Sequence, residues 1–144
     1  MDIEECVEKG LLQRGKPDAV LAGKEWREAG LDLAEAKVLL KEKRFKRSIE
    51  AAYYAMFHAA KTILFKEGFR EKAHYAVLVV LEDMVKNGKL GQRFADDYRA
   101  ALHAREGADY HYSYSQETAV DLVLIAEEFV QEMGKQKPTE VAKG

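Results

Sequence analysis

The chain has 144 residues, of which 47% are hydrophobic and 33% charged, a balance typical of one folded domain and not of a disordered segment. Its formal net charge of −2 gives no overall basic signature for nucleic-acid binding, so any such site must be local. The single cysteine, Cys6, excludes an internal disulfide framework and multi-cysteine metal sites. No apolar run approaches the roughly 20 residues of a membrane span, so we expect a cytoplasmic protein with no membrane partner.

In chain order, the first half of the sequence predicts three helices. The first fifteen residues are expected to form a short helix that ends at Gly15. A second helix has apolar residues spaced from Trp26 to Leu40 and ends in the charged turn at residues 41–44. The third, from Phe45 to about residue 66, has apolar residues at three- and four-residue steps and stops at Gly68.

The second half predicts three more helices. Apolar residues recur at helical spacing over 77–85, before an Asn-Gly turn, and again over 94–102 and 119–133. No useful segment alternates apolar and polar residues as a half-buried strand would. The predicted fold is therefore all-α, an antiparallel up-and-down helical bundle with four core helices and short additional helices. Residues 135–144 are expected to form a polar tail.

Arg105 continues an apolar stripe on the fifth predicted helix. Eleven residues separate it from Phe94, about three turns plus 20° at 100° per residue, so both lie on one face. An arginine on that face must reach solvent at the helix end, pair with an acid, or face a groove or a partner subunit. Asp109, four residues on, offers an ion pair of about 0.3 kcal/mol if exposed. A structural role and a binding role both stay open.

His111 follows Arg105 by six residues. In an unbroken helix the two would lie roughly 120° apart, but Gly107 weakens the helix and residues 113–116 favour the start of the next one. We therefore expect the helix to end near Asp109, which leaves His111 free to fold back toward Arg105. The spacing permits a shared site of the two residues but does not require one. A guanidinium binds phosphate and an imidazole transfers protons, which are the minimum requirements for metal-independent RNA cleavage.

Other candidate groups give weaker signals. His58 and His103 are expected to be packed or surface histidines, whereas His74 begins the fourth helix and could contribute to a polar groove. The run KEKRFKR at residues 41–47 could touch RNA phosphates, although such a run is more often a solvated helix junction. No metal-ligand spacing and no phosphate-binding glycine loop occurs, so we expect no metal and no cofactor.

Three segments resemble the HEPN superfamily, specifically the small bacterial and archaeal proteins of the UPF0332 type. They are SIEAAYYAMFHAAKTILFKEGF at 48–69, AHYAVLVVLEDM at 73–84 and ALHAREGADYHYS at 101–113. The resemblance covers residues 24–134 and implies a single HEPN-like domain over residues 1–134, followed by the flexible tail 135–144. It also implies a homodimer, because members of the family are usually dimeric.

The resemblance implies a ribonuclease toxin. In many members the motif is an arginine, four to six residues, and a histidine, and paired motifs meet in a cleft between two subunits. Arg105 and His111 match this motif and are the implied catalytic residues, RNA being the implied substrate. Asp109, Tyr110 and His74 are the implied supporting or nucleotide-binding residues.

Members of this branch are often encoded with a minimal nucleotidyltransferase, which implies such a partner as antitoxin. In some pairs the partner adds AMP to a tyrosine two places after the histidine. Here Ser113 occupies that place, so the implied modified tyrosines are its neighbours Tyr112 and Tyr114.

A second interpretation follows from the pattern R-x-x-A-D-Y. It begins at Arg105 and places Tyr110 where ribonucleases with shorter spacing have histidine. The chain would then be a non-catalytic HEPN module that binds a nucleotidyltransferase partner or a nucleotide. In a third interpretation the polar residues 105–111 form only a helix-terminal network that stabilises the bundle.

Overall fold

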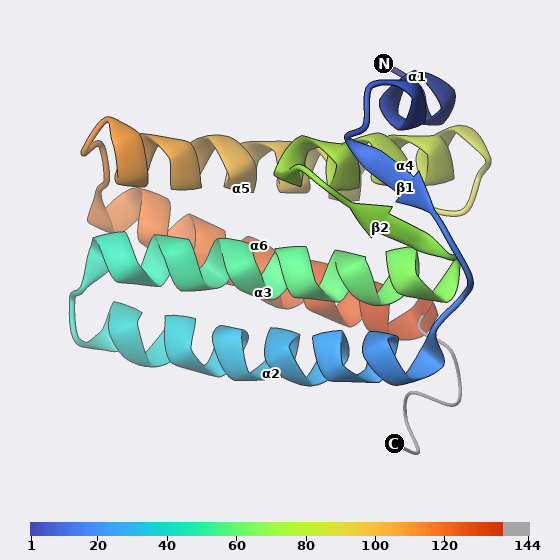
Figure 1. Ribbon diagram of the computed structural model, residues 1–144. Helices are drawn as coiled ribbons and strands as arrows, with labels where there is room; N and C mark the ends of the chain where they lie inside the picture. Colours follow the sequence, from blue (N-terminus) through green and yellow to red (C-terminus); the bar gives the residue numbers. More distant parts are fainter. Residues whose placement is uncertain (137–144) are drawn as a thin grey trace.

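The computed structural model describes residues 1–136. Over these residues α2 and α5 run in one direction and α3 and α6 in the opposite direction, while α1 covers the end of the bundle at which α4 and a small sheet lie (Figure 1). The prediction of an all-α, up-and-down bundle is confirmed. The elements are α1 Ile3–Glu8, β1 Leu12–Arg14, α2 Ala19–Lys41, α3 Phe45–Lys66, β2 Phe69–Glu71, α4 His74–Lys86, α5 Gln92–Tyr110 and α6 Gln116–Gln136.

The central element is α3, which packs against α2, α4, α5 and α6. Its sequence is apolar around most of its circumference, as expected for a helix surrounded by others. The residues that α2 buries are mostly small, so its backbone lies close to α3. At the end of this contact the Ser48 hydroxyl donates to the carbonyl oxygen of Ala36 (2.9 Å), which satisfies a buried polar group.

The N-terminal segment differs from the predicted single short helix ending at Gly15. α1 is only six residues long, and the chain turns at Gly10, where φ is +74°. The next residues form β1, whose Leu12 is buried and lies opposite Glu71 in an antiparallel pair with β2. The prediction was wrong because a strand of three residues has no periodicity of its own and depends on a partner far along the chain.

Gly68 ends α3, as predicted, and joins the helix to this small sheet. Its φ of +86° lies in the left-handed region, and a Cβ there would be 2.5 Å from the carbonyl oxygen of Gly15. The Gly15 N–H in turn donates to the Gly68 carbonyl (2.6 Å). This close approach of two backbones holds the N-terminal arm against the bundle.

The predicted turn between the last two helices is confirmed in outline. α5 ends at Tyr110, and the Ser115 hydroxyl accepts a hydrogen bond from the Thr118 N–H (3.1 Å) at the start of α6. Residues 135 and 136 of the predicted tail belong to α6, and the rest of that tail lies outside the described residues. No helix within residues 1–136 has both the length and the apolar character needed to cross a membrane.

Candidate functional site

Arg105 is the centre of a polar cluster between α3 and α5. Its side chain is only 12% exposed, which agrees with the predicted position on the apolar stripe. The guanidinium carbon lies 5.1 Å from the centre of the Tyr53 ring, close enough for a cation–π interaction. One terminal nitrogen donates to the Tyr54 hydroxyl at 3.4 Å and lies 3.8 Å from a carboxylate oxygen of Asp109. The ion pair expected from the four-residue spacing is therefore present.

Most of the hydrogen-bonding capacity of Arg105 is not used by these contacts. An arginine has five N–H donors, yet only the one long hydrogen bond to Tyr54 is formed within residues 1–136. The Nε atom is buried and has no hydrogen-bond partner in the described part of the chain. Because a buried cation without partners is costly, this arrangement is suited to receiving an anion such as a phosphate group.

The ring beneath Arg105 is held in place by a chain of hydrogen bonds. The Tyr53 hydroxyl is hydrogen-bonded to Nδ1 of His74 (2.6 Å) and to the hydroxyl of Tyr98 (3.0 Å). The imidazole of His74 also stacks on Phe57, with ring centres 4.4 Å apart and planes 7° apart. Tyr53 and Tyr98 are fully buried, so these bonds satisfy hydroxyl groups that have no access to water.

Burial sets the protonation states in this chain of groups. Burial raises the pKa of Tyr53 to about 12, so its hydroxyl stays neutral at physiological pH. Burial first, and the positive charge of Arg105 second, lower the pKa of His74 below its ordinary value. A neutral imidazole at this position retains a lone pair, and Arg105 remains the local positive charge.

A pair of carboxyl groups lies on the other side of Arg105. Glu50, on α3, is close to Asp109, and burial together with this neighbouring carboxyl raises the pKa of Asp109 to about 6. Burial also acts on Glu50, but hydrogen bonds and the charge of Arg47 outweigh it and lower the pKa of Glu50. The Oδ1 atom of Asp109 is buried and has no hydrogen-bond partner among the described residues. Two carboxylates beside one arginine repel each other, so a proton on Asp109 stabilises the cluster.

His111 and Tyr110 do not contact Arg105. His111 is the C-cap of α5, where its N–H donates to the Gly107 carbonyl (3.1 Å) and its side chain is exposed. No side-chain hydrogen bond, ion pair or ring contact of His111 is formed within residues 1–136. Tyr110 is 66% exposed. Of the predicted site residues, the structure brings Arg105, Asp109 and His74 into one cluster. It leaves His111, the predicted catalytic histidine, apart from them.

The two predicted acceptor tyrosines lie on the surface. Tyr112 is 77% exposed and Tyr114 is 49% exposed, both in the turn between α5 and α6. The Lys46 ammonium, at the start of α3, lies 5.7 Å from the centre of the Tyr112 ring. This contact joins the α5–α6 turn to the α2–α3 turn.

The residues that surround Arg105 were missed in the sequence. They all lie on α3, and their spacing (i, i+3, i+4, i+7) would have placed them on one face of the predicted helix. A tyrosine on the buried face of a helix also signals a buried hydrogen-bond partner. The sequence carried both signals, but it did not show which helix would face that surface. The missed residues are Glu50, Tyr53, Tyr54 and Phe57.

His58, expected to be a packed or surface histidine, lies in a separate charged network between α2 and α3. Its Nδ1 contacts Glu25 and its Nε2 is 3.6 Å from Asp32. Lys61 bridges Glu25 and Glu71, at 3.2 and 3.3 Å, so the network reaches β2. In the described part of the chain, no group of three or more His, Cys, Asp or Glu side chains is arranged to hold a metal ion.

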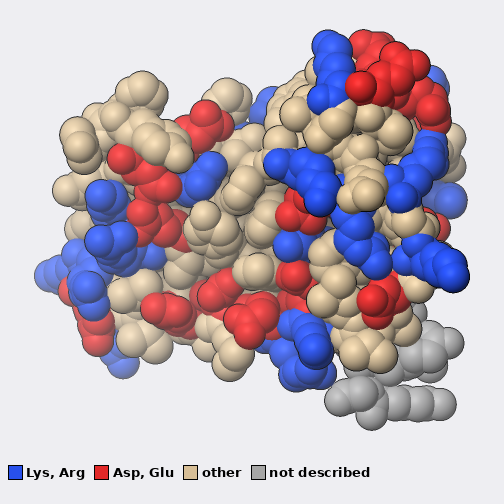
Figure 2. Space-filling view, viewed as in Figure 1, with Lys and Arg blue, Asp and Glu red and all other residues tan. Residues whose placement is uncertain are grey.

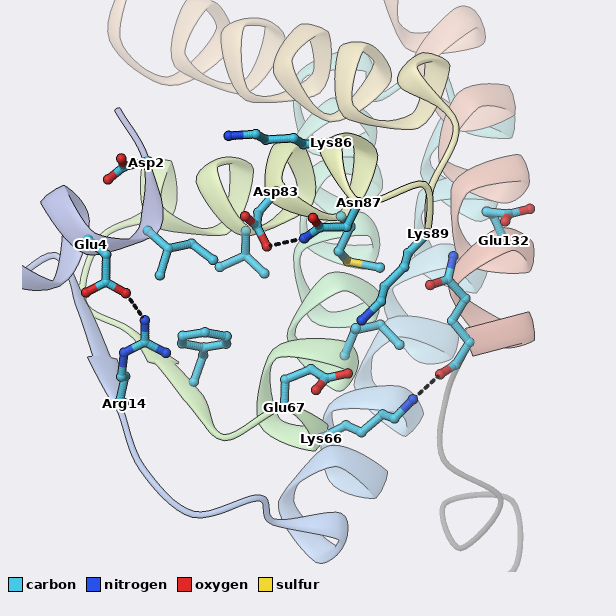
Figure 3. Close-up of a pocket in the computed structure, with 16 residues that line it drawn as sticks. Asp2, Glu4, Arg14, Lys66, Glu67, Asp83, Lys86, Asn87, Lys89 and Glu132 are labelled. Atoms are coloured by element: carbon cyan, nitrogen blue, oxygen red, sulfur yellow. Dashed lines mark hydrogen bonds and ion pairs between the residues drawn. The ribbon is translucent and has the colours of Figure 1, made fainter.

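A cavity of about 970 Å³ lies apart from the Arg105 cluster (Figure 3). It lies between the N-terminal arm and the ends of α3, α4 and α6, with an apolar lining that includes Ile63 and Met84. At its edge Arg14 pairs with Glu4, and the Asn87 side chain donates to Asp83 (Figure 3). None of the predicted site residues lines it.

Comparison with known proteins identifies the family to which the chain is similar. A family model described as the HEPN domain matches residues 23–136. A UPF0332 protein of Thermotoga maritima is 28% identical over 114 residues, 76% of this chain and 86% of that protein. A UPF0332 protein of Archaeoglobus fulgidus is 32% identical over 89 residues, 60% of this chain and 71% of the relative.

A protein of Methanocaldococcus jannaschii that is named as a candidate toxin is also similar. It is 28% identical over 106 residues, which cover 72% of this chain and 79% of that protein. The residues matched by the HEPN family model contain α3, α4 and α5, the elements that carry the Arg105 cluster. The chain therefore belongs to the HEPN domain family, as a small member of the UPF0332 type.

Proposed function

We propose that this protein is a metal-independent ribonuclease toxin of the HEPN type, paired with a minimal nucleotidyltransferase as antitoxin. The observation that carries the proposal is Arg105, a nearly buried arginine on an aromatic ring with most of its donors unpaired. Such a group binds the phosphate of an RNA backbone and stabilises the charge that develops on it during cleavage. Membership of the HEPN family and the relative named as a candidate toxin support the same assignment.

In this proposal His111 transfers the proton. The 2′-hydroxyl oxygen attacks the phosphorus atom as its proton passes to one imidazole, and the bond from phosphorus to the 5′ oxygen breaks. The leaving 5′ oxygen takes a proton from a second imidazole, so the products are a 2′,3′-cyclic phosphate and a 5′-hydroxyl end. No water, metal ion or cofactor enters the balance of this step.

The separation between the two groups gives the proposal a structural requirement. Six residues of helix place His111 about 9 Å beyond Arg105 along the axis, and the two side chains do not touch in one protomer. The site must therefore be completed by a second copy of the chain. A homodimer that apposes the ends of two α5 helices would supply two arginines and two histidines to one cleft.

A second function is favoured by the contacts that Arg105 makes in the protomer. Asp109 lies beside the guanidinium of Arg105. The histidine hydrogen-bonded to Tyr53, whose ring lies beneath that guanidinium, is His74 and not His111. These contacts favour a non-catalytic HEPN module that binds a nucleotide or the nucleotidyltransferase through Arg105. In either case the exposed Tyr112 and Tyr114 are the proposed acceptors of AMP from the partner.

The deciding experiment is RNA cleavage by the purified full chain in the presence of EDTA. We expect wild-type protein to cleave a structured RNA, and both Arg105→Ala and His111→Ala to abolish cleavage while unfolding at the wild-type temperature. His103→Ala, an exposed histidine on the same helix, is the matched control and should cleave normally. Cleavage that survives in both Arg105→Ala and His111→Ala would refute the nuclease.

The same preparation tests the second function. A wild-type chain that leaves the RNA intact but binds ATP or the nucleotidyltransferase, with binding lost in Arg105→Ala, supports the non-catalytic module. Loss of that binding in His74→Ala, with no effect of His111→Ala, would assign the site to the residues that touch each other in the protomer.

A further inference from the structure

One end of the bundle combines unpaired basic residues with exposed tyrosines. The α2–α3 turn and the α5–α6 turn both lie at this end, opposite the N-terminal arm (Figure 1). We call the two segments, residues 41–47 and 110–115, the basic–aromatic end. The contact of Lys46 with the ring of Tyr112 shows that they form one surface.

The positive charge at this end is local and largely free. Residues 41–47 contain five basic residues and a single acid, Glu42, although the chain as a whole has a net charge of −2. Lys and Arg side chains gather on the same end in the space-filling view (Figure 2). Within residues 1–136, the only ion pair formed by these five joins Arg47 to Glu50. The basic residues are Lys41, Lys43, Arg44, Lys46 and Arg47.

Helix termination at this end departs from the rule followed elsewhere in the chain. The residue after the C-cap of α1, α3 and α4 has a positive φ and in each case is a glycine, as steric repulsion requires. In α2 and α5 the same position has the same left-handed conformation but is occupied by Lys43 (φ 61°) and Tyr112 (φ 53°). Those two are the only non-glycine residues with positive φ in the described part of the chain.

Lys43 and Tyr112 therefore place a cation and an aromatic ring at two positions where glycine would be less strained. Backbone conformations of this kind cluster at active sites and ligand-binding sites. Tyr112 is also the most exposed of the large apolar and aromatic side chains, at 77%. The turn therefore presents a largely exposed ring beside the ammonium group of Lys46.

The geometry points to a binding site for single-stranded RNA: we propose that a base stacks on Tyr112 and that Lys43 and Lys46 contact the flanking phosphates. Stacking on an aromatic ring with cations beside it is how proteins bind single strands without reading sequence. A duplex hides the faces of its bases, so an exposed ring selects an unpaired segment. The inference rests on the proposed function, in which RNA is the substrate, and it names the form of RNA and the surface that binds it.

The basic–aromatic end adjoins the Arg105 cluster. Arg47 bonds to Glu50 at 2.9 Å, Glu50 lies beside Asp109, and Asp109 contacts Arg105. His111 immediately precedes Tyr112 in the chain. A base stacked on Tyr112 would therefore lie next to His111, the residue to which the proposed function assigns proton transfer.

The test is binding of the full chain to a fluorescent 2′-O-methyl oligouridylate of about 12 nucleotides, a length that fits single-strand sites. The methyl group prevents attack by the 2′ oxygen, so binding is measured independently of cleavage. We expect Tyr112→Gly to weaken binding by about 5-fold to 150-fold, the effect of losing one stacked base, and Tyr112→Phe to stay within about twofold. Lys43→Gly should weaken binding and lower the slope of log affinity against log salt by about 0.7.

Stability distinguishes loss of binding from loss of folding. Because glycine relieves the left-handed strain, Tyr112→Gly and Lys43→Gly should unfold at a temperature equal to or above that of the wild type while binding less RNA. The matched controls lie elsewhere: the double variant Lys86→Ala, Lys89→Ala at the large cavity, and Tyr75→Ala, an exposed tyrosine on α4. Both controls should bind as the wild type does.

Several results would overturn the inference. One is unchanged affinity in Tyr112→Gly, and another is equal or tighter binding of a duplex of the same length. The third is a Tyr112→Gly variant that binds RNA normally but no longer binds the nucleotidyltransferase, which would make this end a protein interface. Cleavage with an unchanged KM in Tyr112→Gly would refute the single-strand site and leave the ribonuclease intact. RNA binding that depends on Tyr112, without any cleavage by the wild type, would support the single-strand site and refute the ribonuclease.

Discussion

The hydroxyl of Tyr53 makes two hydrogen bonds inside the bundle, so its removal is expected to lower the stability of the protein. Tyr53→Phe preserves the ring beneath Arg105 but removes the hydrogen bonds to His74 (2.6 Å) and Tyr98 (3.0 Å). Tyr98 is fully buried, and its hydroxyl has no other hydrogen-bond partner among the described residues. A buried hydroxyl left without a partner costs about 1–3 kcal/mol, so we expect a loss of about 2 kcal/mol in the free energy of unfolding.

Urea denaturation followed by circular dichroism measures this loss, and thermal unfolding should show a midpoint lower by about 6 °C for a chain of this size. Tyr98→Phe should cost a similar amount, whereas the double variant should cost less than the sum by about 1 kcal/mol, because the second substitution removes the orphaned partner. Tyr75→Phe, at an exposed tyrosine, is the control and should change stability by less than about 0.5 kcal/mol. Wild-type stability of Tyr53→Phe, or additive losses in the double variant, would refute the hydrogen-bonded chain.

Three further predictions concern the helix ends and the carboxyl pair. Gly68→Ala should destabilise the protein by about 1–3 kcal/mol in urea denaturation, because a Cβ at φ +86° meets the backbone of Gly15; a stable variant would contradict this contact. Ser115→Ala should cost about 1 kcal/mol through loss of the α6 cap, and Ser115→Thr should restore most of it. The raised pKa of Asp109, about 6 against an ordinary 3.8, means that the folded protein retains a proton that the unfolded chain loses as the pH rises from about 4 to 6. Stability contributed by this group therefore falls as the pH rises, and Asp109→Asn should gain stability relative to the wild type between pH 4.5 and 7. An equal difference in stability at both pH values would show that burial and Glu50 do not raise the pKa of Asp109.

The Arg105 cluster also predicts how pH affects anion binding. Below about pH 6 Asp109 is protonated and no longer competes for the guanidinium, so binding of an anion to Arg105 should be tighter there than at pH 7.5. Asp109→Asn should bind as tightly at pH 7.5 as the wild type does at lower pH. If the wild type binds the anion equally well at both pH values, Asp109 does not compete with the anion for Arg105.

Local sequence was sufficient for the helices. The apolar spacing of α3, its stop at Gly68 and the cap at Ser115 each depend on residues within a turn or two of one another, so periodicity and termination signals identified them. The same reasoning placed Arg105 on a covered face of α5 and predicted its ion pair with Asp109, because positions three and four residues apart on a helix are neighbours.

The tertiary structure decided which side chains meet across helices. Tyr53, Tyr54 and His74 reach Arg105 from α3 and α4, and no periodicity within one helix states which face of another it will contact. For the same reason β1 was missed, since a three-residue strand exists only through its pairing with β2. The structure also places His111 apart from Arg105. The helix continues as far as Tyr110, which fixes the distance between the two residues and the directions in which their side chains leave the helix. Sequence alone determined where α3 ends and α6 begins, and that an arginine would lie at a covered face of α5. Packing determined the neighbours of that arginine, because contacts between distant segments depend on how whole helices dock.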